Sequence, residues 1–179
     1  MGELKSGFSK WLLLVTFFLT GCSMGMETSP MDAGAYSNRG VAYLMKGQTE
    51  QAIADFTKAL EINPRYADAY INRGLAYGFK GQYDQAISDN TKALEINPTD
   101  ALAYSNRGVA YRRKGQYDQA VADFTKALGI NPRYAEAYDN RGNAYQDKGQ
   151  YDQAISDHTK ALEINPRLDM AYSNRGLAY

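Results

Sequence analysis

The fold is decided by residues 67–100, which read ADAYINRGLAYGFKGQYDQAISDNTKALEINPTD. The chain repeats this stretch with small changes. The triplet Asn-Arg-Gly begins at residues 38, 72, 106, 140 and 174, always 34 residues after the previous copy (72 − 38, for example). A fixed period of this length indicates stacked units, because one such unit cannot bury its apolar face alone. The complete units are residues 33–66, 67–100, 101–134 and 135–168, and residues 169–179 begin a fifth.

Each unit carries the pattern of two short helices. Apolar and small residues recur three and four positions apart in both halves, as the buried face of a helix requires. The first helix is expected to end at Lys-Gly-Gln, where a glycine such as Gly81 supplies the left-handed cap. The second is expected to stop before Asn-Pro, because proline cannot continue a helix. The sequence therefore predicts an all-α fold of helix pairs.

The composition excludes several classes of protein. Lys and Arg number 20 and Asp and Glu number 20, so the chain lacks the basic excess of proteins that bind phosphate backbones. One cysteine and one histidine exclude a disulfide framework and a multi-thiolate metal site. His158 occupies the position of Phe56 and Phe124, which predicts a half-buried packing residue. We expect no nucleic acid partner, no metal and no cofactor.

The repeat resembles the tetratricopeptide repeat family over residues 33–179. In the second unit the residues that carry the resemblance are Tyr70, Gly74, Ala76, Tyr77, Ala86, Ala93 and Pro98. The resemblance implies a right-handed superhelical solenoid of antiparallel helix pairs, with four complete repeats plus one terminal helix. It also implies that Gly74 and Ala86 lie where helices approach closely. Partners of such proteins usually bind in the concave groove lined by the first helices, so we expect a binding scaffold and not an enzyme.

Two charged residues in every complete unit depart from the family pattern. An arginine stands before the signature glycine, where leucine is usual, and an aspartate follows sixteen residues later, where an aromatic residue is common. An unpaired buried charge costs several kcal/mol, so each charge needs a partner. The predicted pairs are Arg39–Asp55, Arg73–Asp89, Arg107–Asp123 and Arg141–Asp157. The alternatives are pairing of each aspartate with the next unit's arginine, and a row of arginines that binds anionic ligands.

The positions that face the groove in the family vary freely between units here, whereas the architectural positions barely change. They are Ser37, Val41, Leu44 and Met45 in unit one; Ile71, Leu75, Gly78 and Phe79 in unit two; Ser105, Val109, Arg112 and Arg113 in unit three; and Asp139, Asn143, Gln146 and Asp147 in unit four. Their character changes from apolar to basic to acidic. We expect units one to three to bind a peptide with an apolar anchor followed by an acidic residue. The alternative is drift at solvent-exposed positions. The family's clamp for a C-terminal carboxylate is not expected, since only Asn143 matches it.

The first 22 residues have the composition of an export signal. Lys5 and Lys10 precede an apolar run over residues 11–20, about half the length that spans a bilayer, as in a secretory signal peptide. The ending Leu19-Thr20-Gly21-Cys22 resembles the lipobox of bacterial lipoproteins. This implies a signal peptide at residues 1–21, acyl chains such as palmitate on Cys22, and a tether that extends to residue 32. The alternative is an ordinary cleaved signal that leaves a free thiol.

This resemblance implies attachment in a bacterial cell envelope. Ser23 stands where an aspartate tends to retain lipoproteins at the inner membrane, so the outer membrane is favoured if the cell has one. We therefore expect a membrane-anchored scaffold for a protein or peptide partner. The alternatives are a self-associating structural array and the anchoring fragment of a longer protein, either enzymatic or active in pilus, secretion or cell-wall assembly.

Two further features of the repeat carry predictions. The last helix, residues 169–179, ends on Leu177-Ala178-Tyr179 without the polar cap that solenoids need. It is therefore expected to serve as the cap, to associate with a second copy, or to precede further chain. Gly129 stands where other units have glutamate, which predicts a looser end of that second helix by about 1 kcal/mol.

Overall fold

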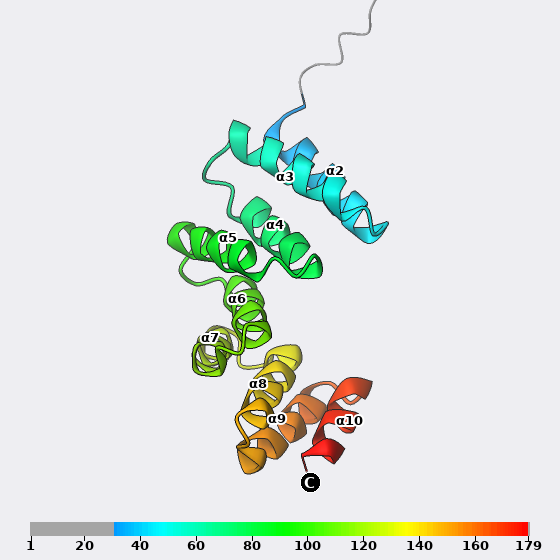
Figure 1. Cartoon of the computed structure of the whole chain (residues 1–179), viewed down its shortest axis with the longest axis vertical. Helices are drawn as coiled ribbons and strands as arrows, with labels where there is room; N and C mark the ends of the chain where they lie inside the picture. The colour runs from blue at the N-terminus through cyan, green and yellow to red at the C-terminus, as the bar shows by residue number, and fades with distance from the viewer. Residues whose placement is uncertain (1–30, 179) are drawn as a thin grey trace, which may run out of the picture. The chain divides into compact units, whose positions relative to one another are not determined.

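The computed structural model describes residues 31–178, and the predicted signal peptide, Cys22 and the predicted tether up to residue 30 lie outside these described residues. Within them the chain forms nine helices and no strand (Figure 1). The helices are α2 (Ala33–Met45), α3 (Thr49–Ile62), α4 (Ala67–Phe79), α5 (Tyr83–Ile96), α6 (Ala101–Arg113), α7 (Tyr117–Ile130), α8 (Ala135–Asp147), α9 (Tyr151–Ile164) and α10 (Asp169–Leu177). The predicted solenoid of four helix pairs plus a terminal helix is confirmed. Between residues 31 and 178, no helix has the length and apolar character needed to span a membrane.

A glycine fixes the turn inside each helix pair. Gly81, between α4 and α5, has φ of 72°, and the corresponding glycines have φ between 71° and 73°, which confirms the predicted left-handed cap. The Gln82 N–H donates to the Tyr77 carbonyl at 2.9 Å across this turn. No atom lies within 4 Å of a Cβ built on Gly81, so the backbone conformation and not lack of space requires glycine here.

An asparagine ends each second helix. The Asn63 N–H makes the last helical hydrogen bond, to the Ala59 carbonyl at 2.8 Å, and its own backbone is extended. Its side chain then accepts from the Arg65 N–H at 3.1 Å, which shapes the turn around Pro64. Asn-Pro therefore stops one unit and begins the connection to the next.

Within each pair the helices approach most closely at the signature glycine. A Cβ on Gly108 would lie 2.9 Å from the ring of Phe124, and one on Gly74 would lie 2.6 Å from the Asn90 amide. His158 fills the same place opposite Gly142. Its exposed fraction is 0 %, so the prediction of a half-buried residue is wrong and the histidine belongs fully to the core.

Neighbouring units pack through the second helix of one pair and the first helix of the next. Thus α3 contacts α4, α5 contacts α6, α7 contacts α8 and α9 contacts α10, and successive first helices also touch. Small residues make this possible: Ala69 packs against Leu60, and Ala103 against Leu94. Gly129 leaves α7 at 14 residues, the same length as α5, so it does not shorten its helix.

Candidate functional site

A pocket of about 430 Å³ lies where units two and three meet, and we call it the inter-repeat pocket. It is formed by α4, by the start of α5 and by α6. Its lining residues are Gly74, Leu75, Gly78, Phe79, Tyr83, Ala86, Asn106, Val109, Ala110 and Arg113. Five of the sixteen groove positions predicted from the sequence therefore line one cavity: Leu75, Gly78, Phe79, Val109 and Arg113.

The floor of the inter-repeat pocket is held in place by the core, and most of its lining is apolar. Ala86 and Ala110 are almost fully buried in helix contacts, so the floor is held by the core. Phe79 stands at the mouth with 68 % of its surface exposed, and Leu75 is exposed beside it. An exposed phenylalanine next to a cavity of this size suits the docking of a large apolar side chain.

Charges near the inter-repeat pocket are mostly neutralised by neighbouring units. Arg112 Nε lies 2.6 Å from Asp147 Oδ2, so the basic and acidic ends of the predicted charge gradient pair with each other. Lys80 at the end of α4 pairs with Glu50 at 3.2 Å, and Lys114 at the end of α6 pairs with Asp84. Arg113 is exposed, and within residues 31–178 its guanidinium has no such partner. It is the available positive charge of the pocket.

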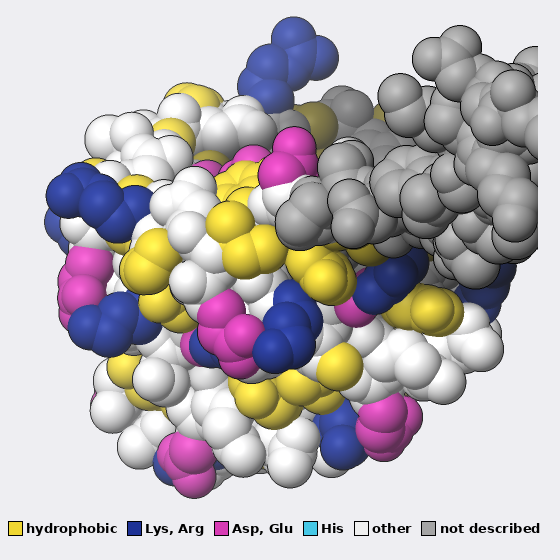
Figure 2. Space-filling view, turned by 90° about the horizontal axis from the view of Figure 1, so that it is seen from above, with side chains coloured by type: hydrophobic (Ala, Val, Ile, Leu, Met, Phe, Trp, Pro, Cys, Tyr) yellow, Lys and Arg dark blue, Asp and Glu magenta, His cyan; other side chains and the backbone are white. Residues whose placement is uncertain are grey.

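Other predicted groove residues remain on the surface. Met45 is 85 % exposed, and Val41 is exposed on the same helix, α2. Leu44 and Asn143 are half-buried. In Figure 2 hydrophobic side chains lie between Lys or Arg and Asp or Glu side chains, and neither charge dominates the face in view.

Ile71 is a wrong groove assignment. Its exposed fraction is 4 %, and it packs in a buried cluster with Leu94 and Ala103. The equivalent residues of units one and three, Ser37 and Ser105, are buried as well. The next unit covers this position of the first helix, so its side chain supports the contact between units and does not meet a partner.

Asp139 is the second wrong groove assignment, for the same reason. It is 8 % exposed, and its Oδ1 lies 2.8 Å from His158 Nδ1, in an arrangement where the ring N–H donates to the carboxylate. The side-chain amide of Asn174 on α10 donates to it at 3.2 Å, and that of Asn143 at 3.3 Å. Asp139 therefore joins α8, α9 and α10 and is not open to a ligand.

The four arginine–aspartate pairs lie as the sequence assigns them, within a unit and not between units. The Nε–Oδ2 distances are 2.6 Å for Arg39–Asp55, 2.8 Å for Arg73–Asp89, 2.7 Å for Arg107–Asp123 and 2.7 Å for Arg141–Asp157. In each pair Nη2 donates to the second carboxylate oxygen, which gives the two-point geometry that guanidinium favours. The hydrogen bonds to Asp89 raise the pKa of Arg73 above its ordinary value.

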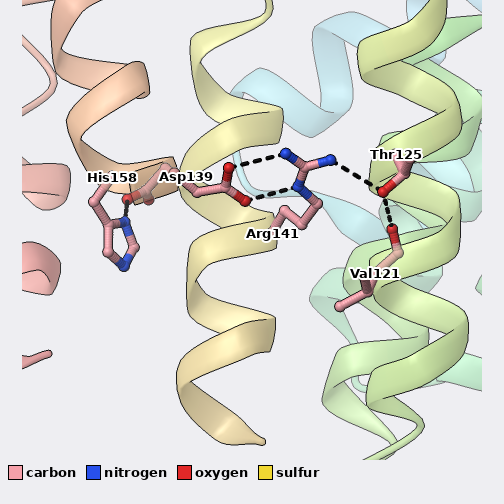
Figure 3. A network of polar contacts seen from close by, with 6 residues as sticks. Val121, Thr125, Asp139, Arg141 and His158 are labelled. Carbon is pink, nitrogen blue, oxygen red and sulfur yellow. Dashed lines mark hydrogen bonds and ion pairs between the residues drawn. The ribbon is translucent and has the colours of Figure 1, made fainter. Parts of the chain in front are cut away.

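In Arg73, Arg107 and Arg141 the remaining nitrogen reaches the preceding unit. Arg141 Nη1 donates to Thr125 Oγ1 at 3.0 Å, and Thr125 donates to the Val121 carbonyl, as Figure 3 shows. The guanidinium also stacks between Tyr138 and Tyr145, at 5.6 and 5.9 Å from the ring centres. With its donors engaged in this way, the row is a structural device and is not suited to hold anionic ligands.

Two contacts are not predicted from the sequence: the arginine–threonine link between units and the Asp139–His158 contact. Both contacts involve residues whose positions in the repeat could have indicated them. Thr57, Thr91 and Thr125 stand at one position of successive units, and Asp139 and His158 are unusual residues of the same unit. No group of three or more His, Cys, Asp or Glu side chains that could hold a metal lies in the described part of the chain.

Comparisons with known proteins agree with this geometry. The family profile described as tetratricopeptide repeat matches residues 33–66, 67–100, 101–134 and 135–168. No curated protein sequence matches the chain significantly. Among solved structures, a crystal structure of MamA is 30 % identical with a TM-score of 0.70, covering 78 % of this chain and 82 % of that one.

Two further structures show the range of the likeness. The Pseudomonas aeruginosa PilF structure is 25 % identical with a TM-score of 0.76, covering 82 % of this chain and 67 % of that one. The first repeat domain of Spaghetti (RPAP3), bound to the HSP90 peptide SRMEEVD, is 28 % identical with a TM-score of 0.61. It covers 63 % of this chain, and 89 % of that domain is matched.

Proposed function

The chain belongs to the tetratricopeptide repeat family, and from this premise we propose that it is a membrane-anchored scaffold that holds a protein or peptide partner on its first helices. The observation that carries the proposal is the inter-repeat pocket with Phe79 exposed at its mouth. A solvent-exposed aromatic side chain beside a cavity favours binding of a partner that buries it. The RPAP3 domain, which has the same fold, is solved with a peptide bound.

The anchor of this scaffold is Cys22. It follows a basic start, a short apolar run and Leu19-Thr20-Gly21, the residues that resemble a lipobox. More than one acyl chain is needed for stable attachment, which lipidation of such a cysteine would supply. The scaffold would then act in a bacterial cell envelope, at the outer membrane where the cell has one.

Crosslinking in the native cell tests partner binding. The wild-type chain is expected to capture a partner that Phe79→Ala captures poorly. Ile62→Ala is the matched control, because Ile62 is also an exposed apolar residue near a helix end but lies outside the inter-repeat pocket. Equal capture by wild type and Phe79→Ala would refute binding at this face.

Membrane fractionation tests the anchor separately. Cys22→Ala is expected to move the protein from the membrane fraction to the soluble fraction, whereas Ser23→Ala is expected to leave it with the membrane. Retention of Cys22→Ala on membranes would refute lipidation as the means of attachment.

A second candidate function is self-association through α10. Met170, Tyr172 and Leu177 are exposed on this helix, and apolar side chains gathered on one short element favour a contact. Sedimentation of the Cys22→Ser chain over a range of concentrations tests it. A second copy would appear as a rise in mass that Leu177→Ser suppresses, and a constant monomer mass would exclude this candidate.

A further inference from the structure

Unit two differs from its neighbours at a residue that lines the inter-repeat pocket. Gly78 lies where unit one has Leu44, unit three has Arg112 and unit four has Gln146. Each of those side chains would occupy the space that Gly78 leaves free. The inter-repeat pocket therefore opens above the one complete unit that has no side chain at this position.

Packing does not require this glycine. No atom lies within 4 Å of a Cβ built on Gly78, and Gly78 is absent from the positive-φ glycines. A glycine inside a helix costs about 1 kcal/mol relative to alanine. The fold thus gains nothing from Gly78, and its visible consequence is the open pocket between Leu75, Phe79 and Val109.

Arg113 gives the inter-repeat pocket a charge preference. Arg112, Lys80 and Lys114 are held by carboxylates of neighbouring units, so their charges are compensated. Arg113 lines the pocket, and its guanidinium has no such compensation among the described residues. A partner that leaves a carboxylate beside Arg113 while burying an apolar group would satisfy both features.

We propose that the inter-repeat pocket takes one large apolar side chain of a partner segment, next to which an aspartate or glutamate side chain pairs with Arg113. The inference rests on the proposed binding function and names the chemistry of its partner. The occupant is an internal acidic segment and not a free C-terminal carboxylate. Arg113 is a single cation, whereas a terminal carboxylate is held by several side chains, and Lys80 and Lys114 are already engaged.

Selection from random peptides tests this chemistry directly. The purified full chain in detergent is exposed to a displayed library in which every peptide is followed by a constant spacer, so that no free carboxyl end is offered. Enriched peptides are expected to share a leucine, phenylalanine or tryptophan with an acidic residue one or two positions away. With Arg113→Glu the enriched peptides should carry a basic residue at that place. Arg133→Glu, at an exposed loop residue outside the pocket, should leave the selection unchanged.

The variant Gly78→Leu distinguishes a loss of peptide binding from a loss of folding. It supplies the side chain that unit one has at this position, and it is expected to raise thermal stability while weakening the best peptide by about thirtyfold or more, as for loss of a binding hot spot. Gly129→Leu, which changes a helical glycine outside the pocket, should raise stability without weakening the peptide. Arg113→Glu should weaken the same peptide by about tenfold.

Three results would overturn the inference. They are enriched peptides without the acidic residue, peptides that bind Gly78→Leu as well as wild type, and binding that appears only when a peptide is made without the spacer and ends in a free carboxylate. In each case partner binding itself survives if the in-cell capture still depends on Phe79. A selection that enriches no peptide also overturns the inference. The proposed function is then refuted only if capture in the native cell also fails.

Discussion

Arg107 has a salt bridge, a hydrogen bond to another unit and two aromatic rings around one guanidinium. It donates to both oxygens of Asp123 at 2.7 and 2.8 Å and to Thr91 at 3.1 Å. Tyr104 and Tyr111 lie on either side of it. All three nitrogens of the guanidinium donate to groups of the protein, which makes a charge tolerable where the family usually has leucine.

Removing one residue of the Arg107–Asp123 pair is expected to lower the free energy of unfolding more than replacing both residues with apolar ones. Asp123→Leu leaves the Arg107 guanidinium without its counter-charge and should lower the free energy of unfolding by about 3 kcal/mol. The double variant Arg107→Leu/Asp123→Leu should recover most of that loss, since two apolar side chains need no compensation. Urea unfolding of the two singles and the double gives the coupling energy. A double variant no more stable than Asp123→Leu would show that the pair is needed for more than charge balance.

Gly129 offers a gain of stability at one residue. In the other units a glutamate at this place pairs with a lysine three residues earlier, at 2.7 Å for Lys58–Glu61. Gly129→Glu is expected to add about 1 kcal/mol from helix propensity and a few tenths more from a contact with Lys126. Gly129→Ala isolates the propensity term. Thermal unfolding compares them, and no gain from Gly129→Ala would mean that the end of α7 does not limit stability.

How well single residues were predicted depends on what their pattern could reveal. The arginine–aspartate pairs were predictable because both charges depart from the family pattern together in every complete unit. Ile71 was misassigned because its burial depends on the next unit, which a pattern within one unit does not contain. Asp139 was misassigned because its contact with His158 in the same unit was not predicted. The Arg112–Asp147 pair also joins two units, and it was not predicted because this pair of charges does not recur in the other units.

Helix ends were the most predictable elements. Gly81 is required by its positive φ, and the Asn-Pro step stops α3 at Ile62 and α7 at Ile130. Both signals are residues next to the helix end, so they can be recognised in the sequence without knowledge of the packing. The docking of α10 is different. It includes the contact of Asn174 with Asp139, two residues far apart in the sequence, and Asp139 is unlike its counterparts in the other units.

Because Asp139 on α8 contacts both α9 and α10, its replacement is expected to change the stability with which these three helices pack. Asp139→Ser should destabilise the chain, because the Nδ1 of buried His158 loses its acceptor. Asp139→Ser/His158→Phe should restore stability, because units one and three already combine serine with phenylalanine at these positions. The two are compared by thermal unfolding. If the double variant is no better than Asp139→Ser, the carboxylate matters mainly through Asn174, and Asn174→Ala should then cost as much.

At the scale of the array, each unit is tied to the previous one by the same two kinds of contact. Alanine and leucine side chains form the apolar part, as between Leu94 and Ala103. An arginine that donates to the preceding threonine forms the polar part. In a repeat array these interfaces determine whether the units unfold together, because each unit contacts only its neighbours. The stacking was predictable from the 34-residue period, whereas the identity of the polar contact is seen only in the structure.

Thr91→Val tests how much this polar contact contributes to cooperativity. The change keeps the shape of the side chain and removes the acceptor of Arg107, so units two and three lose one hydrogen bond, worth about 1 kcal/mol. The dependence of unfolding free energy on urea should become shallower, because the two halves of the array begin to unfold separately. Thr159→Val is the matched control, since within the described residues Thr159 makes no such bond to Arg175. If Thr91→Val shifts the midpoint as Thr159→Val does and leaves the slope unchanged, the apolar contacts alone hold the units together, and the arginine serves only its own unit.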